Sequence, residues 1–187
     1  NDIAQGILGD CWLLAGLACL AEFEGAIHNL FNETKITSDG KYHFHVYNAP
    51  NKNWEIIVVD DFIPCKHNTT EPCFAKPREN EIWVLLAEKA IAKWFGSYIQ
   101  IQGAYTMVPF LILTDVGYCR SFNQQNFTTY TEYKTELLDA RNRDSVKLNV
   151  VGNLSSDSVW YELENADKQN YVMAAWTTKD IPQQIGV

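Results

Sequence analysis

The sequence predicts an α+β fold, and three observations carry that prediction. Residues 11–23 are apolar on nearly every face, which is typical of a helix buried on all sides. Residues 41–47 alternate aromatic or apolar side chains with polar ones, and residues 54–60 are rich in β-branched side chains, so each indicates a strand. Residues 80–95 place their apolar side chains on one broad face, which predicts a second helix.

The boundaries of these elements follow from local chemistry. Asp10 directly precedes the first helix and is a favourable N-cap. The polar residues 48–53 fit the loop of a hairpin between the two strands. Residues 62–79 are rich in proline and polar side chains, so we expect a loop. Gly96 ends the second helix.

Beyond Gly103 the pattern weakens, and we expect a boundary within 103–118, with the chain divided into 1–105 and 106–187. In the second part the sequence predicts a short apolar segment, two helices and one strand, at residues 108–113, 130–140, 157–167 and 171–178 respectively.

Composition excludes several classes of protein. Apolar residues make up 47% and charged residues 20% of 187 residues, which is the balance of a globular domain with a core. The net charge of −8 argues against a nucleic-acid partner, because phosphate binding needs a basic surface. The longest strongly apolar stretches are near a dozen residues, and a membrane span needs about twenty, so we expect no transmembrane segment.

The five cysteines are widely spread and odd in number, which argues against a disulfide framework. They also lack the paired spacing of a zinc site, so reduced thiols in a cytoplasmic protein fit best. The chain begins at Asn1, and we expect it to be a piece of a longer protein.

The segment 5–12, Gln-Gly-Ile-Leu-Gly-Asp-Cys-Trp, holds the candidate chemistry. Cys11 would lie at the N-terminus of a buried helix, where the helix dipole favours a thiolate. The amide of Gln5, folded back by a loop with two glycines, could join the Cys11 backbone N–H in an oxyanion hole, with Trp12 as a wall against water. The alternative is that Cys11 is an inert core thiol, but the whole combination favours a nucleophile.

The same segment resembles the active-site segment of papain-like cysteine proteases, and its Gly-Asp-Cys-Trp-Leu-Leu-Ala form resembles calpains, the calcium-dependent members. Residues 81–93, followed by Gly-Ser-Tyr at 96–98, resemble a calpain helix, and residues 42–45 and 54–61 resemble the strands between. The resemblance implies a papain-like protease core: a helical first subdomain around helix 11–23, continuing past residue 105, and the start of a β-rich second subdomain.

Residue roles are implied position by position. The resemblance implies that Cys11 is the nucleophile and Gln5 the oxyanion-hole glutamine, that Trp12 and Gly103 bind substrate, and that Asp2 and Glu81 bind calcium. Carboxylate oxygens are suitable calcium ligands. The ordinary alternative for Asp2 and Glu81 is a solvated acid near a terminus and an acid in the first turn of a helix.

The sequence departs from the family pattern in places. The family's Gly-His-x-Tyr and Asn-Pro-Trp segments do not occur in it, and none of the four histidines can be assigned to the catalytic role. A helix terminus alone favours a thiolate by only ~0.3–1 kcal/mol, so we expect this chain by itself to be inactive. Ala104 and the segment 115–117 replace glycine-containing turns of the family, which bears on substrate binding.

The resulting prediction is a calcium-dependent cysteine endopeptidase that hydrolyses peptide bonds in intracellular proteins, with the remainder of the protease core as its partner. An inactive calpain-like binding or scaffolding module is the alternative, favoured by Ala104 and opposed by Gln5, Cys11 and Trp12. A lysosomal papain-type protease is a weaker rival, because the Gly-Asp-Cys form argues against it.

Overall fold

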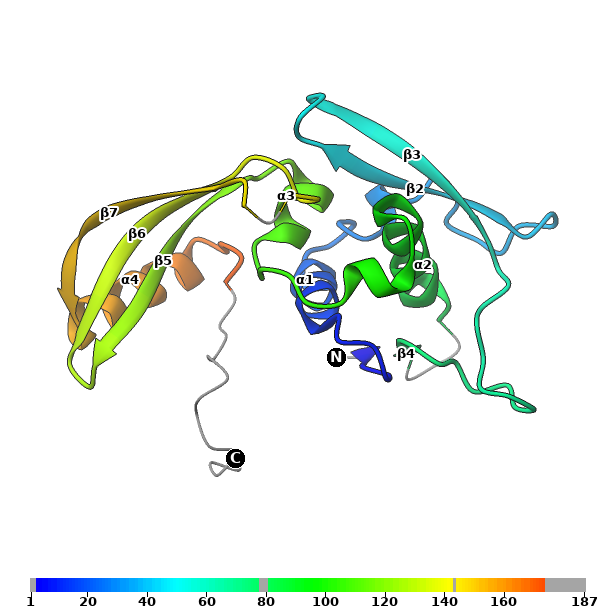
Figure 1. Cartoon of the computed structure of the whole chain (residues 1–187), viewed down its shortest axis with the longest axis horizontal. Helices are drawn as coiled ribbons and strands as arrows, with labels where there is room; N and C mark the ends of the chain where they lie inside the picture. The colour runs from blue at the N-terminus through cyan, green and yellow to red at the C-terminus, as the bar shows by residue number, and fades with distance from the viewer. Residues whose placement is uncertain (1–2, 78–80, 143, 174–187) are drawn as a thin grey trace.

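The computed structural model describes residues 3–77, 81–142 and 144–173 (Figure 1). It is a mixed α+β fold, as predicted, with α1, α2 and a long hairpin in one lobe and a three-stranded sheet with α4 in the other. The short helix α3 (Val108–Thr114) connects the two lobes along the chain. None of the described helices is long and apolar enough to cross a membrane.

Helix α1 (Cys11–Ala21) is the centre of the first lobe, which confirms the prediction of a buried helix. Its side chains are buried in several directions, at Trp12, Leu13, Leu14, Leu17 and Leu20. α3 packs closely on α1 at Gly16, where a Cβ atom would lie 2.3 Å from the ring of Pro109. The close approach requires a residue without a side chain.

The predicted hairpin and second helix are confirmed. β2 (Lys41–Asn48) and β3 (Asn53–Asp60) pair antiparallel in full register, with Phe44 opposite Ile57. α2 (Trp83–Phe95) begins later than the predicted residue 80, and its C-terminus is followed by Gly96 at φ +110°. β2 buries alternate side chains against the helices, so the two-residue period of the sequence has its expected structural cause.

Short elements complete this lobe. β1 (Ile3–Ala4) pairs antiparallel with β4 (Lys76–Pro77), which lies inside the predicted loop 62–79. The 3₁₀ helices are η1 (His28–Leu30) and η2 (Tyr98–Ile101). The β1–β4 pair brings the segment before Cys11 next to the segment before α2.

The second lobe is an antiparallel meander of β5 (Tyr118–Asn126), β6 (Thr129–Leu137) and β7 (Val146–Ser155), with α4 (Ser156–Lys168) along one face (Figure 1). The helix predicted at 157–167 is confirmed as α4. Arg120 on β5 joins the layers, because it donates to Glu132 on β6 and to Glu162 on α4, both at 2.7 Å.

Two predictions for this part are corrected. Residues 130–140 are largely β6 rather than a helix: Thr and Tyr favour the strand, and pairing on both sides outweighs the helix preference of Glu, Lys and Leu. The apolar segment 108–113 is confirmed as the buried helix α3. Of the strand predicted at 171–178, residues 171–173 are not in a strand, and the rest lie outside the described residues.

Candidate functional site

Cys11 is the first residue of α1 and is exposed, whereas Trp12, Leu13 and Leu14 after it are buried. The helix begins tightly, because the N–H groups of Leu13 and Leu14 both donate to the carbonyl of Asp10, at 2.8 and 3.2 Å. The N–H of a first helical residue has no partner inside its own helix. The thiol and a backbone donor of Cys11 therefore lie at an accessible helix N-terminus.

Gln5 is exposed and lies on the loop that leads to Cys11. Its amide nitrogen donates to the carbonyl of Leu8 at 2.6 Å, so the side chain lies along its own loop, bonded three residues before Cys11. A side-chain amide carries two N–H groups, and this bond uses one of them.

The loop is held in place from behind by segment 73–75. A Cβ atom on Gly6 would lie 1.9 Å from the carbonyl oxygen of Phe74, so the two backbones are in direct contact. The N–H of Ile7 also donates to the carbonyl of Cys73 at 3.3 Å. The glycine is required here because any side chain would displace the loop.

The other side of the helix start is held by the end of η2. Trp12 donates its indole N–H to the carbonyl of Ile101 at 2.8 Å, and the N–H of Gly103 donates to the carbonyl of Gly9 at 2.8 Å. Gly103 is exposed and adopts φ +68°, a left-handed conformation that favours glycine. Trp12 is only 2% exposed, so it anchors this segment from the interior instead of forming an exposed wall.

Asp10 does not cap α1, which corrects the sequence prediction. Its backbone is at φ −108° and ψ 25°, outside the extended conformation of a capping residue, and its side chain makes no capping hydrogen bond. The carboxyl group is instead fully buried beside the carboxyl group of Glu88 of α2, and neither of its oxygens has an N–H or hydroxyl donor among the described residues.

Burial is the main cause that raises the pKa of both acids. For Glu88, burial and then the hydrogen bond and charge of Asp10 raise the pKa to about 9, against a smaller opposing effect of the Ala75 N–H. Burial also raises the pKa of Asp10. Glu88 therefore retains its proton near neutral pH and Asp10 is the ionised partner. Sequence analysis missed Glu88, although an acid within the apolar run Val84–Ala92 is an unusual feature.

Of the two predicted calcium ligands, Asp2 and Glu81, the structure describes Glu81. Asp2 lies outside the described residues. Glu81 is exposed just before α2, and one of its carboxylate oxygens accepts the indole N–H of Trp83 at 2.8 Å. Among residues 3–77, 81–142 and 144–173, no group of three His, Cys, Asp or Glu side chains could hold a metal. Glu81 alone supplies too few oxygens for calcium, which takes six to eight.

The histidines on β2 have other local partners. The Nδ1 atom of His43 is hydrogen-bonded to a carboxylate oxygen of Glu33 at 2.6 Å. The Nε2 atom of His45 is hydrogen-bonded to the amide oxygen of Asn32 at 2.7 Å. In the described part of the chain, no hydrogen bond joins a histidine to Cys11. All five cysteines are free thiols in the structure.

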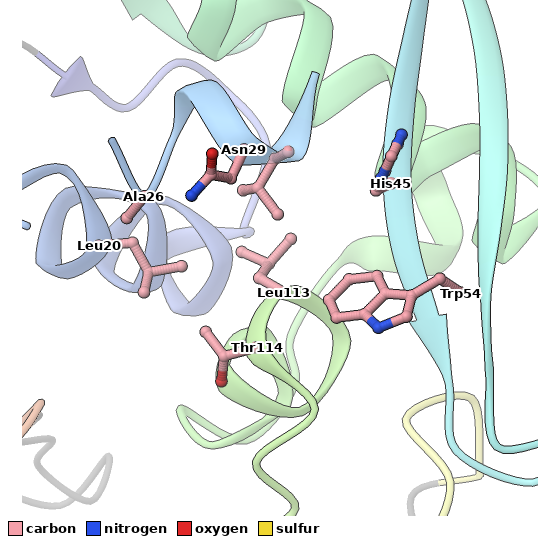
Figure 2. A pocket seen from close by; sticks show the side chains of 8 residues that line it. Leu20, Ala26, Asn29, His45, Trp54, Leu113 and Thr114 are labelled. Carbon is pink, nitrogen blue, oxygen red and sulfur yellow. The ribbon is translucent and has the colours of Figure 1, made fainter. Parts of the chain in front are cut away.

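One hollow lies in the first lobe and a second lies between the first lobe and the β6–β7 connection. The first, of about 360 Å³, lies between the end of α1, β2, β3 and α3, and its lining includes Leu20, His45, Trp54 and Leu113 (Figure 2). It includes no predicted site residue. The other, of about 240 Å³, is lined by Trp12, Phe95, Gln100, Ala104, Ala140 and Arg141. Two residues of this lining lie close to Cys11 or Gly103 in sequence: Trp12 follows Cys11, and Ala104 follows Gly103.

Comparison with known proteins identifies the family of this chain. The family model described as "Calpain family cysteine protease" matches residues 1–184. The calpain-type cysteine protease DEK1 of Zea mays is 37% identical over 115 residues, which are 61% of this chain and 5% of that protein. The calpain-1 catalytic subunit of Mus musculus is 37% identical over 114 residues, 59% of this chain and 15% of its own length.

The human calpain-1 catalytic subunit is also 37% identical, over 110 residues that are 57% of this chain and 15% of the human one. The chain thus spans a small part of the length of these relatives. The family model, however, covers almost every residue, including both lobes. This chain belongs to the calpain family of cysteine proteases.

Proposed function

We propose that the full-length protein is a calcium-dependent cysteine endopeptidase of intracellular proteins, and that this chain carries its nucleophile. The observation that carries the proposal is the exposed Cys11 at the start of a buried helix, with the Gln5 side chain bonded to Leu8 on the loop that leads to it. The five free thiols support a reducing, cytoplasmic compartment.

In the proposed reaction the Cys11 Sγ attacks the carbonyl carbon of the scissile peptide bond. A sulfur–carbon bond forms and the carbonyl becomes an oxyanion; when the oxyanion collapses, the carbon–nitrogen bond breaks, the leaving amine takes the proton that the thiol gave up, and a thioester remains. Water then attacks the thioester carbonyl, the sulfur–carbon bond breaks, and the carboxylic acid product and the Cys11 thiol are released. The second N–H of the Gln5 amide and the Cys11 backbone N–H stabilise the oxyanion. The proton carrier would be a histidine from the rest of the protease core, because His43 and His45 are bonded elsewhere.

Substrate binding is proposed along the segment at Gly103. Its left-handed backbone and its hydrogen bond to Gly9 place a short backbone strip, without a side chain at the exposed Gly103, beside the approach to Cys11. Trp12 would act indirectly, by fixing Ile101 and so this strip. Extended protein segments are the substrate class that such a backbone strip would accept.

The subdomain arrangement is likewise a proposal. We assign residues 1–105 to the nucleophile-bearing first subdomain of a papain-like core, and 106–187 to its remainder and the start of a β-rich second one. The packing of α3 on α1 supports placing residues 108–114 with the first subdomain, and the sheet from Tyr118 onward supports a separate second one.

Calcium would act between Asp2 and Glu81. The β1–β4 pair supports this, because Ile3, the residue after Asp2, lies opposite Pro77, four residues before Glu81. A cation joining these segments would fix the Gln5 loop relative to α2. The remaining oxygens of the site would have to come from other groups.

The function is tested by Cys11→Ser in the full-length protein, because a serine hydroxyl is a much weaker nucleophile of similar size. We expect loss of casein cleavage with an unchanged thermal unfolding midpoint. Cys65→Ser is the matched control, since Cys65 is also an exposed free thiol, and it should cleave normally. Cleavage by Cys11→Ser at an unchanged rate would refute the assignment. A wild-type protein that never cleaves would favour the scaffolding alternative, which Ala104 supports.

The calcium site is tested by isothermal calorimetry of the full-length protein with calcium. We expect the double variant Asp2→Ala, Glu81→Ala to lose one binding event, because two charged ligands are removed. Glu24→Ala, which removes an exposed acid just after α1, is the control and should bind as the wild type does. Unchanged binding by the double variant would remove this site from the account.

A further inference from the structure

Glu88 lies in the middle of α2 with only 2% of its surface exposed. Both of its carboxyl oxygens lie within hydrogen-bond distance of the backbone N–H of Ala75, at 3.0 and 3.2 Å. A buried acid with a single backbone donor is incompletely satisfied, so the second partner decides what the side chain does.

That second partner is Asp10, whose carboxyl is fully buried. Neither Asp10 oxygen receives a bond from an N–H group or hydroxyl donor within the described residues. A hydroxyl on a protonated Glu88 supplies the missing donor. Two buried carboxylates in contact would repel each other, so one shared proton is the state that satisfies both groups.

The Asp10–Glu88 pair is connected by contacts to both of the segments that carry the proposed oxyanion donors. On one side, Asp10 directly precedes Cys11 and accepts the first hydrogen bonds of α1 through its carbonyl. On the other side, Glu88 holds Ala75, and the adjoining residues Cys73 and Phe74 contact the loop that carries Gln5. The Glu88 side chain is therefore linked to both proposed oxyanion donors, the Cys11 backbone N–H and the Gln5 amide.

We infer that Glu88, protonated and hydrogen-bonded to Asp10, is a positioning residue that holds the Gln5 loop and the start of α1 in register for catalysis. The inference rests on the proposed peptidase function. Glu88 does not touch substrate in this account; it acts through Asp10 on the Cys11 side and through segment 73–75 on the Gln5 side.

The other ionisable groups near Asp10 and Glu88, Tyr98 and Lys89, do not bring a further charge to the shared proton. Tyr98 of η2 stacks on Phe74 at 4.2 Å between ring centroids, and burial followed by the charges of Glu88, Asp10 and Asp60 raises its pKa well above the usual range, so it stays neutral. Lys89, the next residue of α2, is turned away to Asp60 and to the carbonyl of Phe62.

The first test compares Glu88→Gln with Glu88→Ala in the full-length enzyme. The amide introduced by Glu88→Gln can accept from Ala75 and donate to Asp10, as the protonated acid does, so kcat should stay within about threefold. Glu88→Ala leaves Asp10 and the Ala75 N–H unpaired, and kcat should fall about 100-fold with a smaller change in KM, as expected for misplaced oxyanion donors.

The second test measures unfolding against pH in a Cys11→Ser background, where the nucleophile does not titrate. The folded Glu88 keeps its proton to about pH 9, whereas the unfolded chain loses it near the ordinary value of 4.5. Stability should therefore fall as pH rises between these values, with a tenfold larger unfolding constant per pH unit, and Glu88→Gln should remove that component. Glu55→Gln is the control: hydrogen bonds from Asn48 and Trp94 lower the pKa of Glu55, so its contribution to stability is complete well above the ordinary value of 4.5 and does not change with pH there.

Each outcome decides a separate claim. A folded Glu88→Ala with wild-type kcat, or a folded Glu88→Gln as inactive as Glu88→Ala, overturns the positioning role. Equal pH slopes for the wild type and Glu88→Gln overturn the shared proton. If Cys11→Ser cleaves at an unchanged rate, the proposed function fails, but the pH slopes still decide the pair.

Discussion

Replacing Gly6 by alanine places one methyl group where the Gln5 loop touches segment 73–75. The added Cβ would lie 1.9 Å from the Phe74 carbonyl oxygen and 2.7 Å from that of Cys73. Both obstacles are backbone atoms, so no side-chain rotation relieves the overlap. The loop or the segment must move by about 1 Å to restore a normal contact.

The magnitude follows from that displacement. A 1 Å misplacement of a catalytic group costs about 100-fold in rate, or about 2.7 kcal/mol of transition-state stabilisation. Overpacking at a buried contact also costs about 1–3 kcal/mol of folding stability. We therefore expect Gly6→Ala to lower kcat/KM about 100-fold in the full-length enzyme and to lower its unfolding midpoint.

The assay is cleavage of a fluorogenic peptide, with thermal unfolding measured on the same samples. Gly152→Ala on β7 is the matched control, since a Cβ atom there meets nothing within 4 Å and Gly152 does not have a left-handed backbone. Wild-type kcat/KM for Gly6→Ala would show that the contact between the loop and segment 73–75 does not position the oxyanion donor.

Three further changes test other contacts. Gln5→Ala should lower kcat about 10²–10³-fold by removing one oxyanion donor, and an unchanged kcat in steady-state assays would make Gln5 a loop residue only. Gly16→Ala should destabilise the chain by about 1–3 kcal/mol in urea unfolding, because the new Cβ would overlap Pro109 at 2.3 Å; an unchanged midpoint contradicts this. Arg120→Ala should cost about 1–3 kcal/mol in the same assay, since Glu132, with an 8% exposed side chain, loses its partner; no loss would mean that water replaces the arginine.

The sequence predicts an element well when its apolar residues follow one clear periodicity and all of them face the core. Helix α1 is apolar on nearly every face and is buried, and the hairpin follows its two-residue alternation. β6 was predicted wrongly because residues 134–140 contain helix-favouring side chains, while the strand is stabilised by β5 and β7, whose pairing local propensity does not encode.

In the candidate site, too, residues within one sequence motif are predictable and contacts between distant segments are not. Gln5, Cys11 and the glycines between them lie within one motif, and the structure arranges them on one loop and helix start. Asp10 was predicted as a cap from its position alone, but its burial depends on Glu88, 78 residues away in sequence. Glu88 lies in an otherwise largely apolar run, but the adjacent Lys89 makes it resemble an ordinary exposed helix position, so its partner Asp10 is identified only by tertiary packing.

The central claim is that Cys11 is the reactive thiol of a peptidase. Labelling the full-length protein with a peptidyl epoxide, with and without calcium, and mapping the modified cysteine by mass spectrometry tests it most directly. Cys11 and Cys65 are both exposed free thiols, so Cys65 is an internal control for simple accessibility. We expect labelling of Cys11 alone, faster with calcium and lost in Gln5→Ala. Equal labelling of Cys65, or no labelling of Cys11 in either condition, would contradict it.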